Sequence, residues 1–374
     1  MPASAPVLSI CIPTYNRADL LDLCLATVLP QVAEHAGRVE CVIRDNASPD
    51  HTAAVIGRYE KDYPLRRHRN DENLGGLVNV LDIALRQARG EYIWLIGDDD
   101  TLNRGAVAHL LTFLDRQESA HPDVIGVNVA YLPEAERPGP ETGLGGITAS
   151  SQHLMRQSGD DGPVPFDALF EAPSADFTAM YGFLLRRRVW IDSLGDWDPP
   201  RGNPFVCVEG TYPHACAVAR ALPNVTASVI RQPLVTIYEL DPADFLWARF
   251  HPLNTLLWAS ALHRLFEQRG VSRETLQPFR QLQWKRAQER LPRMIREPEF
   301  AGGWPEAIRF VACTPGIRIP LVLLVLQIAI FQDPTNNWLL RTLTTLRTNF
   351  TRVIRYLSRD SRPARWWRAK SRNL

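Results

Sequence analysis

Short β-rich apolar runs alternate with helical patterns over the first 131 residues, and this alternation limits the possible folds more than any other feature. Strands are expected at residues 7–13, 39–44, 65–69, 91–96 and 124–131. Helices are expected between them, at residues 19–32, 51–63, 77–88 and 104–117. Strands separated by helices pair in parallel and are covered on both faces. The chain is therefore predicted to have an α/β fold with a mostly parallel, Rossmann-like sheet and helices on both faces.

The pattern is less regular after residue 131. A stretch rich in Pro, Gly and Ser at 132–165 is expected to be a long loop or boundary. An apolar strand that runs into a helix is expected at 177–190, and further helices at 213–221 and 246–268. We expect two domains: 1–240, whose two halves are about 1–131 and 165–240, and a helical C-terminal region at 241–374.

Composition favours a folded protein of the cytoplasm. The 374 residues are 45% hydrophobic, which is enough for a full-sized core, and the net charge of +1 argues against a nucleic-acid partner. The six cysteines are spread singly among apolar residues, which is typical of buried thiols in a reducing compartment. No secretory signal is expected at residues 1–6, because they contain no basic residue.

The C-terminal region carries the features that bear on location. Residues 319–331 are strongly apolar but too few to span a bilayer, so they form either a core helix or an interfacial segment. From Arg341 onward nearly every charged residue is basic, and Trp366 and Trp367 lie within this run. Such a composition suits contact with an anionic leaflet, although a solvated tail or an RNA-contacting arm would have the same charge. We expect peripheral contact with the inner face of the cell membrane.

Polar residues follow three of the expected strands at their carboxyl ends, in the stretches 13–17, 45–48 and 97–100. Ligands of open α/β sheets bind at this edge. Asp98, Asp99 and Asp100 are adjacent, and three carboxylates repel one another unless a cation lies among them. Oxygen ligands suit Mg²⁺ or Mn²⁺. The alternative is that Asp100 or Asn103 only caps the next helix.

Two further stretches leave alternatives open. Asp45 followed by Asn-Ala-Ser is either a ligand-binding carboxylate or an ordinary turn. Residues 70–76 form a loop into a helix, whose free N–H groups either hold phosphate or are capped by Asn73.

Taken together, the series IPTYNR, RDNAS, Asn-x-Gly before a helix with Asn79, and GEYIWLIGDDD resembles family 2 glycosyltransferases of the GT-A fold. The resemblance is closest to bacterial enzymes that build O-antigen, capsule and other surface polysaccharides. It covers residues 7–131 well and 177–221 loosely. It implies that the first half binds a nucleotide-sugar and the second half an acceptor.

The resemblance also implies roles for individual residues. The nucleotide-sugar pocket would be lined by Pro13, Tyr15, Arg17, Asp45, Asn73, Asn79, Asp98 and Asp99. Asp45 would accept a hydrogen bond from the base, and Asp98 would lie toward the ribose. Asp100 would hold the divalent metal, and Asp99 could serve either role.

The chain departs from the family at the catalytic base. Many members present Glu-Asp before a helix, whereas this chain reads Val-Glu-Gly-Thr-Tyr-Pro-His at residues 208–214. Glu209 is the first candidate for the base and His214 the second, with Asp196 and Asp198 behind them. His214 could equally be a metal ligand or a structural residue.

These observations predict an inverting, metal-dependent glycosyltransferase that uses a nucleoside-diphosphate sugar and a lipid-linked or polysaccharide acceptor. The base takes the acceptor proton while the metal stabilises the departing diphosphate. Two alternatives remain: a nucleotidyltransferase, and a catalytically silent family member that serves as a nucleotide-sugar-binding or membrane scaffold.

Overall fold

The computed structural model describes residues 5–117, 121–138, 152–153, 159–170, 176–198, 207–239, 252–283 and 285. The chain divides into two compact units, Met1–Phe310 and Val311–Leu374, and the described residues belong to the first. None of their helices is long and apolar enough to cross a bilayer. The segments at 319–331 and 341–374, predicted to contact a membrane, lie outside the described residues.

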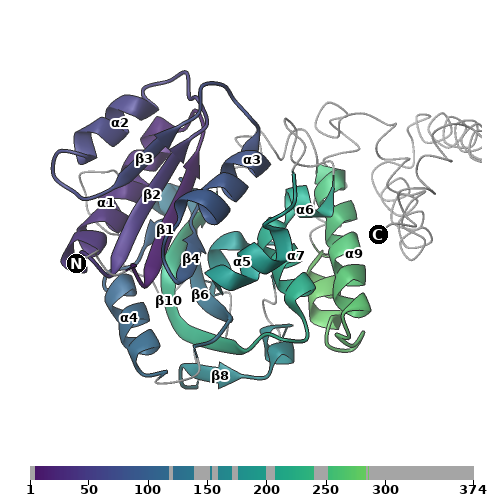
Figure 1. Cartoon of the computed structure of the whole chain (residues 1–374). Coiled ribbons are helices and arrows are strands. Elements are labelled where there is room, and N and C mark those ends of the chain that lie inside the picture. The colour runs from purple at the N-terminus through teal and green to yellow at the C-terminus, as the bar shows by residue number, and fades with distance from the viewer. Residues whose placement is uncertain are drawn as a thin grey trace, which may run out of the picture. The chain divides into compact units, whose positions relative to one another are not determined.

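One mixed sheet organises the described part of the chain (Figure 1). Its strands are β1 (Leu8–Thr14), β2 (Val39–Asp45), β3 (Arg66–Arg69), β4 (Tyr92–Leu95), β5 (Thr101–Leu102), β6 (Val124–Pro133), β7 (Gln152–His153), β8 (Gly162–Val164), β9 (Phe183–Arg186) and β10 (Ala227–Glu239). They lie in the order β3-β2-β1-β4-β9-β6-β10-β5, with β7 beside β6 and β8 beside β10.

The direction of the strands sets the position of the candidate site. β3, β2, β1 and β4 are parallel, and β6 is parallel to β10. β9 runs antiparallel to both β4 and β6, so those two strands point the same way. The carboxyl ends of β1, β2, β4, β6 and β10 therefore lie at one edge of the sheet, where β2, β1 and β4 are neighbours.

Helices cover both faces of this sheet, as predicted (Figure 1). The α-helices are α1 (Ala18–Glu34), α2 (Thr52–Tyr59), α3 (Gly76–Leu81), α4 (Ala106–Asp115), α5 (Arg187–Leu194), α6 (Val208–Thr211), α7 (Pro213–Ala221) and α9 (Pro252–Gln268). Successive strand residues point to opposite faces. Ile10 therefore packs with α1, α2 and α4, whereas Cys11 packs with α3, α5, α7 and α9.

The elements differ from the sequence expectations in one start and one added strand. The strand expected from residue 177 begins only at Phe183, because Thr178 N bonds Asp176 Oδ1 at 3.0 Å in a turn and Met180–Gly182 is a 3₁₀ turn. The helix expected at 77–88 is confirmed, and it continues from α3 as a π-helix at Asp82–Gln87. The long strand β10 was not predicted, and it completes the second half of the sheet.

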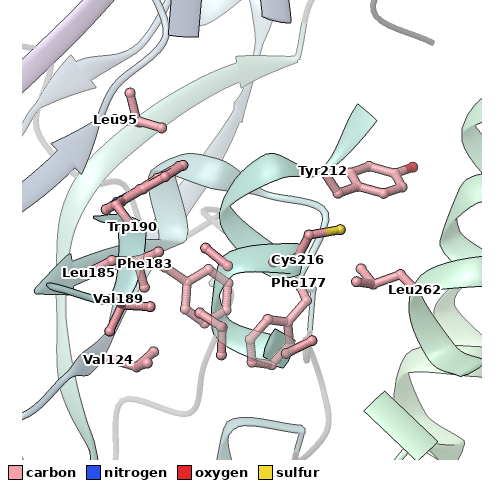
Figure 2. Close-up of a cluster of buried hydrophobic side chains, with 14 of the residues drawn as sticks. Leu95, Val124, Phe177, Phe183, Leu185, Val189, Trp190, Tyr212, Cys216 and Leu262 are labelled. Atoms are coloured by element: carbon pink, nitrogen blue, oxygen red, sulfur yellow. The ribbon is translucent and has the colours of Figure 1, made fainter. Parts of the chain in front are cut away.

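An aromatic cluster joins α9 to the sheet. The rings of Phe177 and Phe183 stack with centroids 4.5 Å apart, and Phe266 of α9 meets Phe177 edge-on at 5.1 Å. Figure 2 shows this cluster, with Leu262 of α9 on the side of Cys216. Phe266 and Leu262 are fully buried. The described helix of the predicted C-terminal region therefore shares a core with the residues before 240, and the domain boundary at 240 stays a prediction.

Candidate active site

The turn after β1 reaches the carboxylates that follow β4. Thr14 Oγ1 donates a hydrogen bond to Asp98 Oδ2 at 2.7 Å. The guanidinium of Arg17 bridges two carboxylates: Nη1 lies 2.6 Å from Asp98 Oδ1, and Nη2 lies 2.7 Å from Asp99 Oδ2. The turns that follow β1 and β4 therefore meet.

The three aspartates concentrate negative charge in a buried place. Asp98 and Asp100 are 4% and 3% exposed. Burial raises the pKa of Asp98 to about 6, although Arg17 acts in the opposite direction, and burial raises the pKa of Asp100 well above its usual range. Arg17 is one positive charge facing three carboxyl groups. The cluster is therefore stabilised by protonation or by a further cation.

Two carboxylate oxygens converge beside Gly97, in an arrangement that suits a metal ion. A Cβ built on Gly97 would lie 2.7 Å from both Asp99 Oδ1 and Asp100 Oδ2, so the glycine leaves open the space between them. Within the described ranges, no three His, Cys, Asp or Glu side chains form a group that could hold a metal. Two carboxylates fit Mg²⁺ or Mn²⁺, which keep waters and bind substrate phosphates.

At the end of β2, Asp45 is buried and already bonded. Its Oδ1 accepts a hydrogen bond from Ser48 N at 2.9 Å, and its Oδ2 pairs with Arg69 of β3. Arg69 also donates to the Ser48 carbonyl at 2.9 Å. Asp45 thus forms the turn and the ion pair at once, so a nucleotide base would compete with Arg69 for it.

Four asparagines tie the loop before α3 to the end of β2. Asn46 Nδ2 donates to Asn73 Oδ1 at 2.7 Å, and Asn70 Nδ2 donates to Asn46 Oδ1 at 2.7 Å. Asn79 accepts from Asn70 at 3.2 Å and donates to the Arg44 carbonyl at 3.0 Å. In this structure the amides of Asn73 and Asn79 shape the loop; their predicted contact with the nucleotide-sugar stays a prediction.

The remaining predicted pocket residues lie in the turn after β1. Pro13 is half-buried, and Tyr15 is 36% exposed, which makes it one of two large hydrophobic residues exposed within the described ranges. Asn16 adopts a left-handed conformation with φ of 55°, and its N–H donates to Ser48 Oγ at 2.8 Å. The turn therefore leaves the ring of Tyr15 open to a partner.

Glu209, the first candidate for the base, lies on α6 and is 7% exposed. Its Oε1 accepts from Arg220 Nη2 at 2.7 Å. This ion pair holds the carboxylate in place and joins α6 to α7.

His214, the second candidate, is 4% exposed on α7. Its Nε2 lies 3.0 Å from the Phe177 carbonyl, so Nε2 carries the hydrogen and Nδ1 is the free acceptor nitrogen of a neutral ring. No hydrogen-bond partner reaches Nδ1 among the residues with defined positions. Burial lowers the pKa of His214 to about 4.

Several polar residues of this edge were missed in the sequence. Thr14 and Arg69 bind the predicted aspartates, and the hydroxyls of Tyr131 and Tyr181 meet at 3.1 Å near Asp100. Thr14 could have been found, because it is the last residue of β1. Tyr181 lies 50 residues from Tyr131, and no local pattern marks such a pair.

The first part of the chain matches a known protein family. The model of glycosyl transferase family 2 matches residues 9–155, a stretch that contains Arg17, Asp45 and the three aspartates. Residues 9–155 are therefore similar to a family 2 glycosyltransferase domain. The mixed, mostly parallel sheet between two helical layers is the GT-A fold that the resemblance implies. Glu209 and His214 lie outside the matched stretch.

The glycosyltransferase domain is similar to parts of curated proteins. Abequosyltransferase RfbV of Salmonella typhimurium is 38% identical over 113 residues, which are 30% of this chain and 33% of RfbV. The GalNAc(5)-diNAcBac-PP-undecaprenol beta-1,3-glucosyltransferase of Campylobacter jejuni is 32% identical over 111 residues, or 28% of this chain and 34% of that protein. The matches thus span about a third of each relative's length, so they concern the domain and not the whole proteins.

Solved structures give weaker likenesses. TarS 1–349 of Staphylococcus aureus in complex with UDP-GlcNAc has a TM-score of 0.48 at 16% identity, over 77% of this chain and 72% of that one. Mannosyltransferase PcManGT from Pyrobaculum calidifontis, in complex with GDP-Man and Mn²⁺, has a TM-score of 0.47 at 17% identity, over 96% and 89%. Likenesses of this extent carry no inference about the ligands of the domain.

Replacing Arg17 with glutamine is expected to destabilise the metal-free domain. The change leaves buried Asp98 and its neighbour Asp99 without their cation, which should lower the free energy of unfolding by about 1–3 kcal/mol. Urea unfolding would measure it, and added Mn²⁺ should restore part of the loss. The control is Arg38→Gln, whose partner Asp115 is exposed, with an expected loss of about 0–1 kcal/mol. Equal losses in the two variants would show that Arg17 does not stabilise the cluster.

Proposed function

We propose that this chain transfers a sugar from a nucleoside-diphosphate sugar to an acceptor hydroxyl, with Mn²⁺ or Mg²⁺ bound at Asp100 and with inversion at the anomeric carbon. The strongest support is the meeting of three parallel strand ends at one edge. That edge brings together Asp45, the three aspartates and the exposed ring of Tyr15. Such an edge provides a carboxylate for a base, an aromatic surface and metal-binding oxygens at once.

The donor side follows from the contacts of these residues. Asp45 would bind the base after Arg69 is displaced, and Tyr15 would pack against it. Asp98, which Arg17 and Thr14 hold in place, would face the ribose. Asn73 and Asn79 would keep the loop before α3 close to the donor.

The reaction itself needs few groups. A bound divalent metal supplies positive charge that stabilises the departing diphosphate. Asp100, with Asp99, would hold it. Glu209, or His214 in its place, would take the proton of the acceptor hydroxyl as that oxygen attacks the anomeric carbon.

The acceptor is proposed to be lipid-linked or a growing polysaccharide in bacterial surface glycan synthesis. The name of the Campylobacter jejuni relative includes a PP-undecaprenol acceptor. The basic run from Arg341 and the apolar residues 319–331 suit an anionic leaflet. We therefore place the protein at the inner face of the cell membrane, without a nucleic-acid partner.

Calorimetric titration of the full chain with UDP, GDP, dTDP and CMP, each with and without Mn²⁺, tests the proposal. One nucleoside diphosphate should bind selectively, several-fold more tightly with Mn²⁺, and the matching sugar nucleotide should be slowly hydrolysed. Absence of metal-dependent binding to any of them would overturn the proposal. Binding without hydrolysis or transfer to any acceptor would leave the scaffold alternative.

A further inference from the structure

The turn of Gly97 to Asp100 is attached to both halves of the sheet. On one side it follows β4, and on the other it leads into β5, which pairs with β10 through Thr101 and Thr236. Thr236 Oγ1 donates to Asn103 Oδ1 at 2.7 Å, and Asn103 Nδ2 donates to the Pro233 carbonyl at 2.9 Å. The position of the three aspartates thus depends on β10 as well as on β1 and β4.

Arg137, just after β6, reaches this turn from the second half. Its Nη1 donates to the Asp99 carbonyl at 3.0 Å. Its Nε and Nη2 donate to the two carboxylate oxygens of Glu134 at 2.7 and 2.9 Å. Its guanidinium lies over the ring of Tyr238 of β10, 4.8 Å from the centroid, and the side chain is 11% exposed.

Tyr238 completes the arrangement. Its ring supports the guanidinium of Arg137 from β10. Glu134, Arg137 and Tyr238, here called the Arg137 clamp, therefore hold the Asp99 carbonyl, directly before Asp100. Asp99 is held twice: its carboxylate by Arg17 and its carbonyl by Arg137.

We propose that Arg137 is a positioning residue for the metal and the donor, an inference that rests on the proposed function. By binding the Asp99 carbonyl, the guanidinium fixes the peptide between Asp99 and Asp100 and leaves the carboxylates of both aspartates available for a metal. Glu134 fixes two of its nitrogens and Tyr238 fixes its plane, so Arg137 has little freedom to move. The clamp keeps Asp99 Oδ1 and Asp100 Oδ2 converging beside Gly97, and it links that geometry to the end of β6.

The test measures Mn²⁺ and nucleoside-diphosphate binding by calorimetry, and kcat and KM separately, on full-length variants. Arg137→Met should weaken Mn²⁺ binding at least tenfold and weaken metal-dependent nucleotide binding in parallel, while nucleotide binding without metal stays unchanged. Glu134→Gln, which touches neither Asp99 nor the aspartate side chains, should shift Mn²⁺ binding several-fold in the same direction. Arg137→Lys, which keeps the charge but not the two bonds to Glu134, should lie between wild type and Arg137→Met.

Controls separate this inference from the proposed function. Arg38→Met, an exposed ion-paired arginine, should leave every constant unchanged. If the wild-type chain binds neither Mn²⁺ nor a nucleotide, the proposed function fails first. If it binds both, but folded Arg137→Met and Glu134→Gln bind Mn²⁺ as wild type does, Arg137 is only structural and the inference is wrong. If Arg137→Met does not fold, the Mn²⁺ and nucleotide binding constants of Glu134→Gln and Arg137→Lys decide whether the inference holds.

Discussion

Asp100→Asn should lose metal-dependent sugar transfer by at least about a thousandfold while the metal-free protein becomes no less stable. Asparagine has the size of aspartate and keeps an oxygen for the Gly97 N–H, which Asp100 Oδ2 now accepts at 2.9 Å. It removes one negative charge from a crowded, buried cluster, where burial and Asp99 already raise the pKa of Asp100. Metal binding should therefore weaken, while the repulsion among the three aspartates is relieved and the metal-free protein keeps its stability.

Three measurements check this expectation: Mn²⁺ affinity by calorimetry, sugar-nucleotide turnover, and the melting temperature without metal. Asp115→Asn is the matched control, since Asp115 is an exposed carboxylate on α4 that pairs with Arg38. It should change neither binding nor turnover. Asp100→Asn with wild-type turnover in Mn²⁺ would show that Asp100 does not hold the metal. A large fall in melting temperature would show that Asp100 is needed to build the turn.

The first half of the fold was predictable because its signals are local. β1, β2 and β4 are short apolar runs, and each is followed by polar residues at its carboxyl end. Parallel pairing then places those ends together without further information. This is why the contact between Arg17 and the aspartates, 81 and 82 residues away, follows from a pattern read within each segment.

The second half carries weaker local signals. β10 contains Arg231, Gln232 and Pro233, which interrupt its apolar run, and its pairing with β6 shifts register on both sides of Pro233. A proline lacks the N–H that a central ladder needs, so such a stretch does not read as a strand. Asn46 bonds Asn70, 24 residues away, and Arg137 bonds Asp99, 38 residues away, and both contacts are set by the assembled sheet. Spacing alone cannot reveal them.

Glu209→Gln should lower kcat by about 10²–10⁴-fold while leaving the affinity for the sugar nucleotide unchanged, if Glu209 takes the acceptor proton as proposed. The amide keeps the size and one acceptor oxygen for Arg220, but it cannot accept a proton at neutral pH. Single-turnover transfer and donor titration would measure the two quantities separately. His214→Gln, in the same assays, tests the second candidate for the base.

The variant Arg220→Met distinguishes a catalytic role of Glu209 from a structural one. The change removes the cation that lies 2.7 Å from Glu209 Oε1 and leaves the carboxylate in place. The free energy of unfolding should therefore fall by about 2 kcal/mol. This loss is smaller than for a fully buried pair, because the Arg220 side chain is 28% exposed. The chemical step of the folded fraction should change far less than in Glu209→Gln. Parallel losses of stability and kcat in both variants would mean that Glu209 serves only to join α6 to α7. A large loss of kcat confined to Glu209→Gln would instead make Glu209 the base, because only that variant lacks the proton-accepting carboxylate.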